Sequence, residues 1–387
     1  MIIKNGNLVL KDEILEGADI KIEGDKIVEI GYALSGGEEY DATGKYVLPG
    51  LVDIHTHGGF GGDFMDEDIE DYENALKFHS SSGTTSLLTS SVTAPVKSIE
   101  FMVKRTREYM KKTDICRVLG AHIEGPYISY KNKGAQKAEF LRVPDKDSYD
   151  FILDNSDVIK NVTISTELPG AVEMTKALKE KGIVVSGGHD DGRSDTIYPC
   201  IEAGLSNCTH WYCAMSTARV EEGKRYAGLM EIGLTDERLT LELLADNHHI
   251  IPELLKVAYK CKGADKLCIV SDCLRAGGMP RDGRVYTLGM KDDEEATKFI
   301  VSDGVARLTD GTRFAGSIQP LSQMLRNIVE NGIPLVDATK MASLTPAKVI
   351  GMEKEIGSLE KGKLADIYIA DENLYPAKVM IGGKFIK

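Results

Sequence analysis

The sequence predicts a (β/α)₈ TIM-type barrel, an α/β fold, with a small β-sandwich domain formed from both chain termini. Between residues 51 and 355, short apolar runs alternate with amphipathic helical stretches, a pattern typical of βαβ units and a parallel sheet. Eight strand–helix repeats favour a closed barrel over an open sheet. The predicted barrel strands are 51–54, 84–89, 117–122, 162–166, 183–186, 206–209, 239–244 and 266–271.

The two chain ends share a different pattern. Residues 1–50 and 356–387 consist of short alternating segments separated by turn signals, such as Gly24–Asp25 and Gly382–Gly383. Because chain ends often lie close together, we expect both segments to build one small composite β domain. The remainder, residues 51–355, forms the second domain, the barrel.

Amphipathic periodicity predicts helices between most of the barrel strands, for example over 67–79, 171–181 and 252–261. Residues 276–316 are rich in Gly, Asp and Arg, which indicates a loop-and-hairpin excursion after the eighth strand. Two further helices, at about 318–331 and 335–350, then lead back to the C-terminal β segment.

Composition excludes several classes of function. A formal net charge of −13 argues against a nucleic-acid partner, because neutralising phosphates requires an exposed basic surface. The sequence has no signal-peptide pattern and no apolar run of about 18 residues, so we expect no membrane partner. The seven cysteines include no CxxC pair, which favours reduced thiols and a cytoplasmic location.

Most of the eight histidines fall at the ends of the predicted strands. The C-terminal ends of the strands carry the chemistry of a barrel of this type, so side chains at these ends should converge on one site. For any single histidine, a satisfied structural role is an equally good interpretation, but the set together favours a functional site. In chain order these positions are His55, His57, His122, Glu124, His189, His210, His249 and Asp272.

The residue types indicate a metal site. His55 and His57 are two apart on an extended segment, so both rings project to the same side. With Glu124, His189 and His210 they form a mixed nitrogen and oxygen ligand set that leaves a position for water, as a catalytic metal site requires. These ligands admit zinc, iron or manganese, with one or two ions per subunit.

Asp272 ends an apolar strand with a carboxylate beside this set. A metal lowers the pKa of a bound water to about 7, but the remaining proton must still move. The amine that leaves an amide also needs a proton, and one carboxylate can accept the first and deliver the second. Asp272 is therefore the candidate general acid and base, whereas the alternative is an ordinary turn or N-cap residue.

The motifs resemble those of a known family. Residues 48–58, LPGLVDIHTHG, look like the opening of the amidohydrolase superfamily, and residues 122–127, HIEGPY, are similar to the HxEGP motif of N-acetylglucosamine-6-phosphate deacetylases. The resemblance spans nearly the whole chain. It implies that Glu124, His189 and His210 bind the principal metal and that Asp272 is the general acid/base. It also implies that His55 and His57 bind a second metal, with Glu124 bridging.

The resemblance further implies that a metal-bound hydroxide hydrolyses the acetamide of N-acetylglucosamine 6-phosphate to acetate and glucosamine 6-phosphate, in a homodimer. Two positions depart from the family: Gln136 replaces a histidine and Cys213 replaces an asparagine. The family's phosphate-binding arginine stretch is absent, although Arg219 and Arg225 make that region cationic. The positions expected to bind substrate are His249, Gln136, Cys213, Ala214, Arg225 and Arg219.

Three alternatives stay open. The substrate could be another N-acetylated sugar phosphate, such as the galactosamine epimer, or the chain could be another amidohydrolase deacylase. A cyclic amidase is disfavoured, because Thr166–Glu167–Leu168 at the fourth strand end provides no lysine to bridge two metals. An inactive metal-binding or sugar-sensing paralogue is the alternative from a different class, and Asp272 argues against it.

Overall fold

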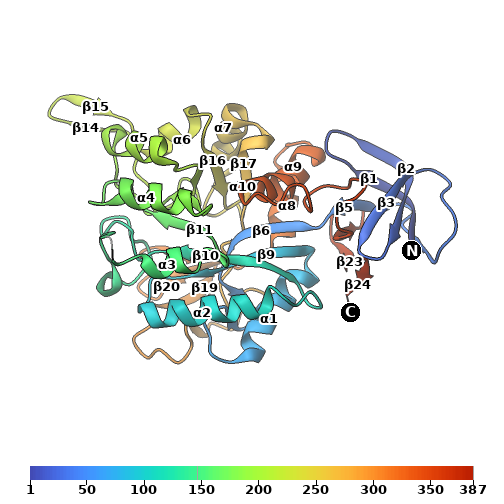
Figure 1. The fold of residues 1–387 in the computed structure, drawn as a ribbon, viewed down its shortest axis with the longest axis horizontal. Helices are drawn as coiled ribbons and strands as arrows, with labels where there is room; N and C mark the ends of the chain where they lie inside the picture. The colour runs from blue at the N-terminus through green and yellow to red at the C-terminus, as the bar shows by residue number, and fades with distance from the viewer. Residues whose placement is uncertain (146, 387) are drawn as a thin grey trace.

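The computed structural model describes residues 1–145 and 147–386, so the last residue of the predicted terminal domain lies outside it. Its larger part is a barrel of eight parallel strands surrounded by helices (Figure 1). The predicted fold class is confirmed. The barrel strands are β6 (Leu51–Thr56), β9 (Thr84–Ser91), β10 (Arg117–Glu124), β11 (Ile159–Ile164), β12 (Val184–Gly187), β13 (Asn207–Cys208), β16 (Thr240–Leu243) and β17 (Leu267–Ile269).

The barrel strands pair in chain order from β6 to β17, and every pair is parallel. The seam between β17 and β6 is closed just beyond the end of β17. There the backbone N–H of Asp272 donates to the carbonyl of His55 (2.9 Å), and that of Ser271 donates to a carboxylate oxygen of Asp53 (3.2 Å). The sheet is therefore a nearly closed barrel, and its last contact brings Asp272 beside the end of β6.

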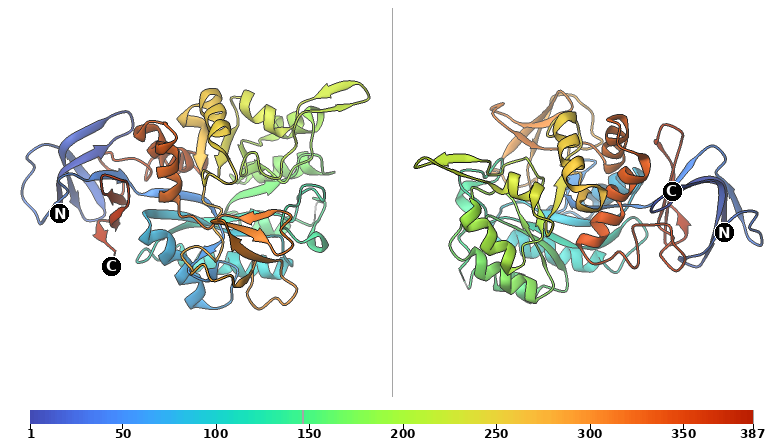
Figure 2. Two further views of the ribbon diagram at one scale, coloured as in Figure 1. Left: turned by 180° about the vertical axis from the view of Figure 1, so that it is seen from behind. Right: turned by 90° about the horizontal axis from the view of Figure 1, so that it is seen from above.

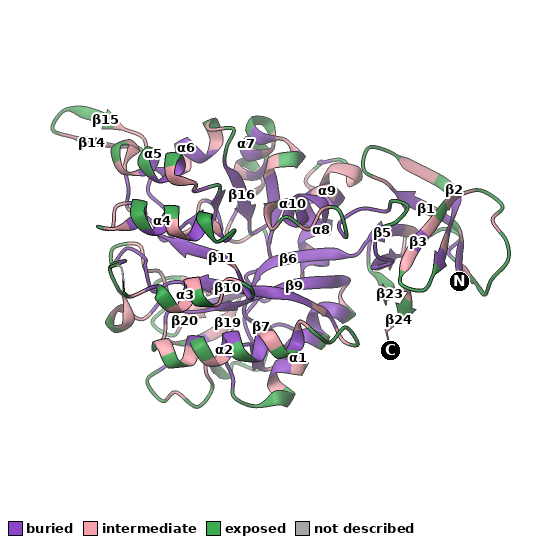
Figure 3. Ribbon diagram, viewed as in Figure 1, coloured by how far each residue is buried: buried purple, intermediate pink, exposed green. Residues whose placement is uncertain are grey.

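Helices cover the outside of the barrel, so its strands are buried on both faces (Figure 3). The predicted helices are present, with the C-terminal one divided into two at Ser343. The helices are α1 (Ile69–Ser81), α2 (Val96–Tyr109), α3 (Asp150–Asp154), α4 (Ala171–Glu180), α5 (Ser194–Ala203), α6 (Leu229–Thr235), α7 (Pro252–Lys262), α8 (Leu321–Glu330), α9 (Leu335–Ala342) and α10 (Leu344–Val349). None of those in the described ranges is long and apolar enough to span a bilayer.

The fourth barrel strand lies earlier than predicted, at Ile159–Ile164 instead of 162–166. The sequence hides its beginning because Asn161, a polar residue, points into the barrel. Its side-chain oxygen accepts a hydrogen bond from Ser186 (2.6 Å), and Ser186 in turn accepts one from Asn207 (2.9 Å). Asn207 also donates to Glu242 (2.8 Å). A polar layer thus crosses the barrel interior and reaches the carboxylate of Glu242.

Both termini build a second sheet, which lies at one end of the molecule (Figures 1 and 2). One C-terminal strand, β22 (Ile367–Ala370), pairs with β5 (Tyr46–Pro49), which places the C-terminal strands in one sheet with the N-terminal ones. An apolar cluster that includes Ile20, Val47 and Ile367 forms the core of this domain. The composite β domain is confirmed, while its division at residues 50 and 356 stays a prediction. Its strands are β1 (Ile2–Val9), β2 (Ile14–Glu23), β3 (Lys26–Gly31), β4 (Glu39–Asp41), β5 (Tyr46–Pro49), β22 (Ile367–Ala370), β23 (Pro376–Ile381) and β24 (Lys384–Phe385).

Smaller antiparallel elements decorate the barrel. The excursion predicted over 276–316 contains a four-stranded sheet that returns the chain to the mouth of the barrel. A hairpin that the sequence analysis did not identify extends away from the barrel after β13 (Figures 1 and 2). These strands are β7 (Gly58–Gly59), β8 (Gly62–Asp63), β14 (Arg219–Glu221), β15 (Lys224–Tyr226), β18 (Val285–Thr287), β19 (Lys298–Ser302), β20 (Val305–Leu308) and β21 (Phe314–Gly316).

An ion pair joins the two sheets and gives a stability prediction. Arg117, at the start of β10, donates two hydrogen bonds (3.0 and 3.2 Å) to the buried carboxylate of Asp366, beside β22. Replacing Arg117 by methionine leaves that carboxylate without its cation, so the free energy of unfolding should fall by about 2–4 kcal/mol, measured by urea denaturation. The control is Arg107→Met, which breaks the more exposed pair with Asp157 and should cost about 0–1 kcal/mol. Equal effects in the two variants would contradict the assignment.

Candidate metal centre and active site

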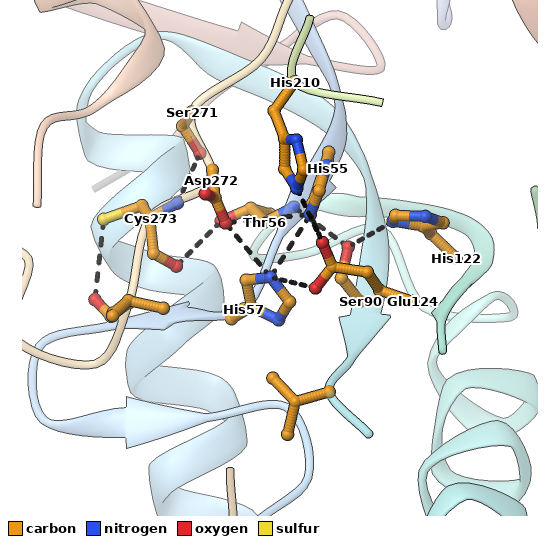
Figure 4. Close-up of polar contacts among 12 residues, drawn as sticks. His55, Thr56, His57, Ser90, His122, Glu124, His210, Ser271, Asp272 and Cys273 are labelled. Atoms are coloured by element: carbon orange, nitrogen blue, oxygen red, sulfur yellow. Dashed lines mark hydrogen bonds and ion pairs between the residues drawn. The ribbon is translucent and has the colours of Figure 1, made fainter. Parts of the chain in front are cut away.

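The predicted metal-binding side chains converge at the C-terminal ends of the barrel strands (Figure 4). They form two groups, within each of which the ligand atoms lie within 4.8 Å of one another. Every member is buried, so the two groups form one enclosed site. The first group is His55, His57 and Asp272, and the second is Glu124, His189 and His210.

Glu124 lies between the two groups. Its Oε1 is 3.0 Å from His210 Nε2 and 3.2 Å from His189 Nε2, and it is also 3.5 Å from His55 Nε2. Its Oε2 is 3.5 Å from His57 Nε2. One carboxylate therefore faces both groups, the arrangement required of a bridging ligand.

The backbone aims three of these side chains by an unusual conformation. His189, His210 and Asp272 each follow a barrel strand by two or three residues and have φ of 47°, 27° and 43°. Residues other than glycine rarely adopt positive φ, and such strained positions concentrate at functional sites. The turn at the strand end directs each side chain over the mouth of the barrel instead of along its wall.

Outer hydrogen bonds fix which ring nitrogen faces the site. Nδ1 of His189 donates to the backbone carbonyl of Asn132 (2.8 Å), since that oxygen can only accept. Nδ1 of His55 donates in the same way to the carboxylate of Glu242 (3.1 Å), which also accepts from the backbone N–H of His210 (3.2 Å). The Nε2 lone pairs of His55 and His189 therefore point inward, as metal-ligating imidazoles require.

The geometry fits a divalent cation. The inward nitrogens lie close together in pairs, 3.1 Å apart for His189 and His210 and 3.3 Å apart for His55 and His57. In a tetrahedral site with metal–nitrogen bonds of 2.0–2.1 Å, neighbouring ligand atoms are separated by about 3.3 Å. Two ring nitrogens so close together in a buried site need a proton or a metal cation between them.

Electrostatics favour the same conclusion. Burial alone would lower the pKa of His57 and of His210, but hydrogen bonds to carboxylates and the charges of Glu124 and Asp272 raise both to about 9. Burial would raise the pKa of Asp272, yet the hydrogen bond from His57 and the charge of His55 hold it below its usual range. The cluster thus attracts cations, and Asp272 is ionised and able to accept a proton at neutral pH.

A cavity of about 300 Å³ opens onto this cluster. Among the residues predicted to contact substrate, His249, Gln136, Cys213 and Ala214 line the cavity. The ring of His249 is held by a hydrogen bond between Nδ1 and the carboxylate of Asp246 (2.7 Å). Pockets for small ligands commonly measure about 300–1,000 Å³, so the cavity suits one small molecule with its reacting end at the metal cluster.

The structure does not bring Arg219 and Arg225 to the cavity of the same chain. Both lie on the β14–β15 hairpin, and neither is among the cavity-lining residues. Arg219 instead forms ion pairs with Asp191 (3.2 Å) and Glu221 (2.7 Å), whereas Arg225 is exposed. His122 is also outside the metal cluster, because Ser90 and Thr163 occupy its two ring nitrogens.

Several residues of the site escaped the sequence analysis, among them one that orients a ligand and two that line the cavity. Glu242 orients His55 from inside a strand, and its only sequence signal is a carboxylate within an apolar run. Arg313 and Phe314 line the cavity from the excursion after the eighth strand. No spacing in the sequence links that excursion to the cavity.

The comparisons with known proteins agree with this geometry. The model of the amidohydrolase family matches residues 46–386. The chain belongs to the amidohydrolase family. Members of this family are metal-dependent hydrolases, so the chain is an enzyme of that class with two candidate metal-binding groups.

Individual amidohydrolases resemble the chain over most of its length. An N-acetylgalactosamine-6-phosphate deacetylase from Escherichia coli O157:H7 is 32% identical, with 88% of this chain and 87% of that protein covered. An N-acetylglucosamine-6-phosphate deacetylase from Haemophilus influenzae is 32% identical, with 91% and 89% covered. The crystal structure of N-acetylglucosamine-6-phosphate deacetylase from Pasteurella multocida has a TM-score of 0.90 at 30% identity and covers 99% of this chain and 98% of that one.

Proposed function

We propose that this amidohydrolase removes the acetyl group from N-acetylglucosamine 6-phosphate, releasing acetate and glucosamine 6-phosphate. The observation that carries the proposal is the position of Asp272. Its carboxylate lies 3.1 Å from His57 Nε2, and both residues line the same cavity as Glu124. A metal cluster with a proton carrier beside it suits amide hydrolysis. Several relatives at about 30% identity bear this deacetylase name, and a variant from Mycobacterium smegmatis was crystallised with N-acetyl-D-glucosamine-6-phosphate.

We assign Glu124, His189 and His210 to the principal metal and His55 with His57 to a second one, bridged by Glu124. Zinc, iron and manganese all suit this mixed ligand set. When bound, a divalent metal lowers the pKa of a water molecule and polarises the amide carbonyl. The protein's part is to hold the ligands rigidly, since outer hydrogen bonds orient the inward nitrogens of His55 and His189, and the backbone turn at His210 orients its ring.

Asp272 carries the proton in this proposal. Its ionised carboxylate accepts a proton from the attacking water and then delivers it to the nitrogen of the leaving amine. Burial suits this task, because few water molecules compete for the proton. His249, fixed by Asp246, and Ala214 bind the sugar portion at the other end of the cavity.

A galactosamine substrate is the second candidate. The relative from Escherichia coli O157:H7 carries the name of the galactosamine enzyme, and Gln136 and Cys213 both line the cavity at positions that depart from the glucosamine family. A change of sugar stereochemistry would alter contacts at such positions and leave the metal ligands unchanged. This candidate therefore predicts the same chemistry on the other epimer.

The deciding experiment is an assay of acetate release by the metal-loaded protein. The substrates are N-acetylglucosamine 6-phosphate, N-acetylgalactosamine 6-phosphate and unphosphorylated N-acetylglucosamine, each with zinc, iron or manganese. Preferential turnover of the first supports the proposal, and preferential turnover of the second transfers the function to the galactosamine epimer. Absence of acetate from all three, with metal bound, rejects both and favours a binding paralogue.

Gln136 provides a prediction about the bridging carboxylate. Its amide donates to Glu124 Oε2 (2.7 Å), and its carbonyl accepts from the backbone N–H of Thr93 (2.7 Å), so the side chain is fixed at both ends. Gln136→Leu should weaken metal binding or activity by about 10–100-fold, as the loss of such an outer partner usually does. Metal affinity is measured by titration against a chelator.

The comparison variant is Gln136→Glu, which has the same shape but places a second carboxylate against Glu124. Repulsion should make its loss of activity larger than that of Gln136→Leu. Wild-type metal affinity and activity in both variants would show that the hydrogen bond to Glu124 has no role.

We further propose a homodimer in the cytoplasm. The β14–β15 hairpin supports the dimer, because it extends from the barrel and exposes Val220 and Arg225, which could contact a second copy. All seven cysteines are free, which supports a reducing compartment.

A further inference from the structure

A shallow depression lies beside the mouth of the cavity and shares Gly134 and Arg313 with it. Its volume is about 320 Å³, comparable with the cavity itself. A ligand whose reacting end lies at the metal cluster could therefore extend past Arg313 into this depression. The chain segments that form it are the loop after β10 and the excursion that includes β20 and β21.

The depression is cationic, although the whole chain has a net charge of −13. Lys131, Lys133 and Arg313 line it, against the single carboxylate of Asp310. Asp191 neutralises Lys131 (2.9 Å). Within residues 1–145 and 147–386, neither Lys133 nor Arg313 has a carboxylate within ion-pair distance.

The available donors of these two cations suit an anion. The Lys133 ammonium donates one hydrogen bond to the backbone carbonyl of Gln136 (3.1 Å), which fixes its place and leaves two protons for a ligand. Arg313 carries a guanidinium fork, which matches two oxygens of a phosphate. Together they provide a point charge and a fork at the rim of one cavity.

The rim is also adjacent to the substrate end of the cavity. A side-chain carbon built on Gly134 would lie 3.2 Å from the ring of His189 and 4.0 Å from Ala214. Arg313 directly precedes Phe314, whose ring lies 4.8 Å from that of His249. The depression therefore adjoins the part of the cavity that the predicted sugar-binding residues Ala214 and His249 line.

The charges of the cavity explain why an anion should bind in the rim depression and not beside the metal cluster. The cavity floor already holds the carboxylates of Glu124 and Asp272, which would repel a phosphate dianion. The hairpin provides no substitute within the same chain, because Arg219 is paired with Asp191 and Glu221. The cations at the rim can bind the anionic end of a substrate while its amide end reaches the metal cluster.

We propose that Arg313 and Lys133 form a phosphate-binding subsite, so that one chain recognises the phosphate of its own substrate. This inference rests on the proposed function for its substrate, a sugar phosphate. The subsite makes Arg313 a specificity residue: it distinguishes phosphorylated from unphosphorylated sugars and takes no part in the hydrolysis itself.

The test uses Arg313→Gln and Lys133→Gln, with Arg225→Gln as the comparison on the hairpin. Charge-assisted hydrogen bonds to a phosphate should contribute a factor of about 10–100 in affinity. Arg313→Gln should therefore raise KM for N-acetylglucosamine 6-phosphate by about 10–100-fold with kcat little changed. Its kcat/KM for unphosphorylated N-acetylglucosamine should stay within about threefold of wild type, and Lys133→Gln should act in the same direction.

A binding measurement separates the subsite from the catalytic proposal. Glucose 6-phosphate has no acetamide, so its binding by calorimetry depends on the phosphate and not on hydrolysis. If wild type binds it and Arg313→Gln loses that affinity, the subsite is supported even if no acetate is released, in which case only the proposed function fails.

Three results would overturn the subsite while leaving the proposed function intact. One is unchanged glucose 6-phosphate affinity in both Arg313→Gln and Lys133→Gln. Another is an equal loss of kcat/KM on phosphorylated and unphosphorylated sugars. The third is a loss of phosphate affinity in Arg225→Gln alone, which would assign recognition to the hairpin.

Discussion

Replacing Asp272 by asparagine should lower kcat for acetate release by about 10³-fold while the metal content stays at the wild-type level. General acid–base catalysis by a positioned side chain typically contributes 10²–10⁴-fold. Asparagine keeps an oxygen at the position of the native carboxylate, which lies 3.1 Å from His57 Nε2, but its amide cannot carry a proton. The backbone should tolerate the change, because asparagine adopts positive φ at least as readily as aspartate.

The measurement is acetate release at saturating substrate, together with elemental analysis of the dialysed protein. A suitable control is Asp282→Asn, which changes an exposed carboxylate in the excursion and should leave kcat unaffected. Activity of Asp272→Asn near that of wild type would reject the proton-carrier role. A large loss of metal would instead indicate that Asp272 acts mainly as a ligand of the first group.

The barrel was predictable because its signals are local and repeated. Apolar runs with helical stretches between them mark each βα unit, and that alternation survives even where a strand is as short as Asn207–Cys208. The terminal sheet was predictable for the same reason, since period-2 segments at both ends need a partner. The beginning of β11 was missed because Asn161 faces a polar layer inside the barrel, which a hydrophobic pattern cannot reveal.

The candidate site was also predicted only in part. The histidines were found because strand ends meet at one edge of a barrel, so their positions in the chain determine their proximity. Partners that come from distant segments were not found in this way. The sequence suggests that Arg219 is a free cation, but in the structure it pairs with Asp191 and Glu221. The sequence places Arg313 in a loop, and the structure shows that it lines the cavity.

Gln136 illustrates a third case, in which the sequence identifies a position but not its contact. Its departure from the family pattern marked it as a residue near the substrate. In the structure it lines the cavity and also donates to Glu124, so a substitution there affects the bridging carboxylate as well as the ligand. A side-chain amide with two fixed partners cannot be recognised from residue type alone.

His189→Ala and His210→Ala should each weaken metal binding by more than about 100-fold and abolish most of the acetate release. Losing an outer hydrogen-bond partner costs 10–100-fold in metal affinity, and losing a ligand should cost more. Either change also removes a nitrogen within 3.2 Å of Glu124 Oε1, which leaves the bridging carboxylate less compensated. Metal per chain is measured by elemental analysis after dialysis.

The matched control is His79→Gln, because His79 is an equally buried histidine that contacts Thr56 and the carbonyl of Gly58 instead of the cluster. Burial lowers its pKa to about 4, so it is a neutral structural residue, and its replacement should reduce stability but not metal content. If His79→Gln lost as much metal as His189→Ala and His210→Ala, the metal loss in all three variants would be explained by misfolding.

The two groups also predict different stoichiometries, which decides between one metal and two. If both groups bind, wild type should hold two ions per chain, and His55→Ala should hold one, because its ring belongs only to the first group. If only the second group binds, wild type and His55→Ala should both hold one, and His210→Ala should hold none. Glu124 faces both groups, so Glu124→Ala should remove every ion in either case, and retention of a full complement by that variant would contradict the bridging assignment.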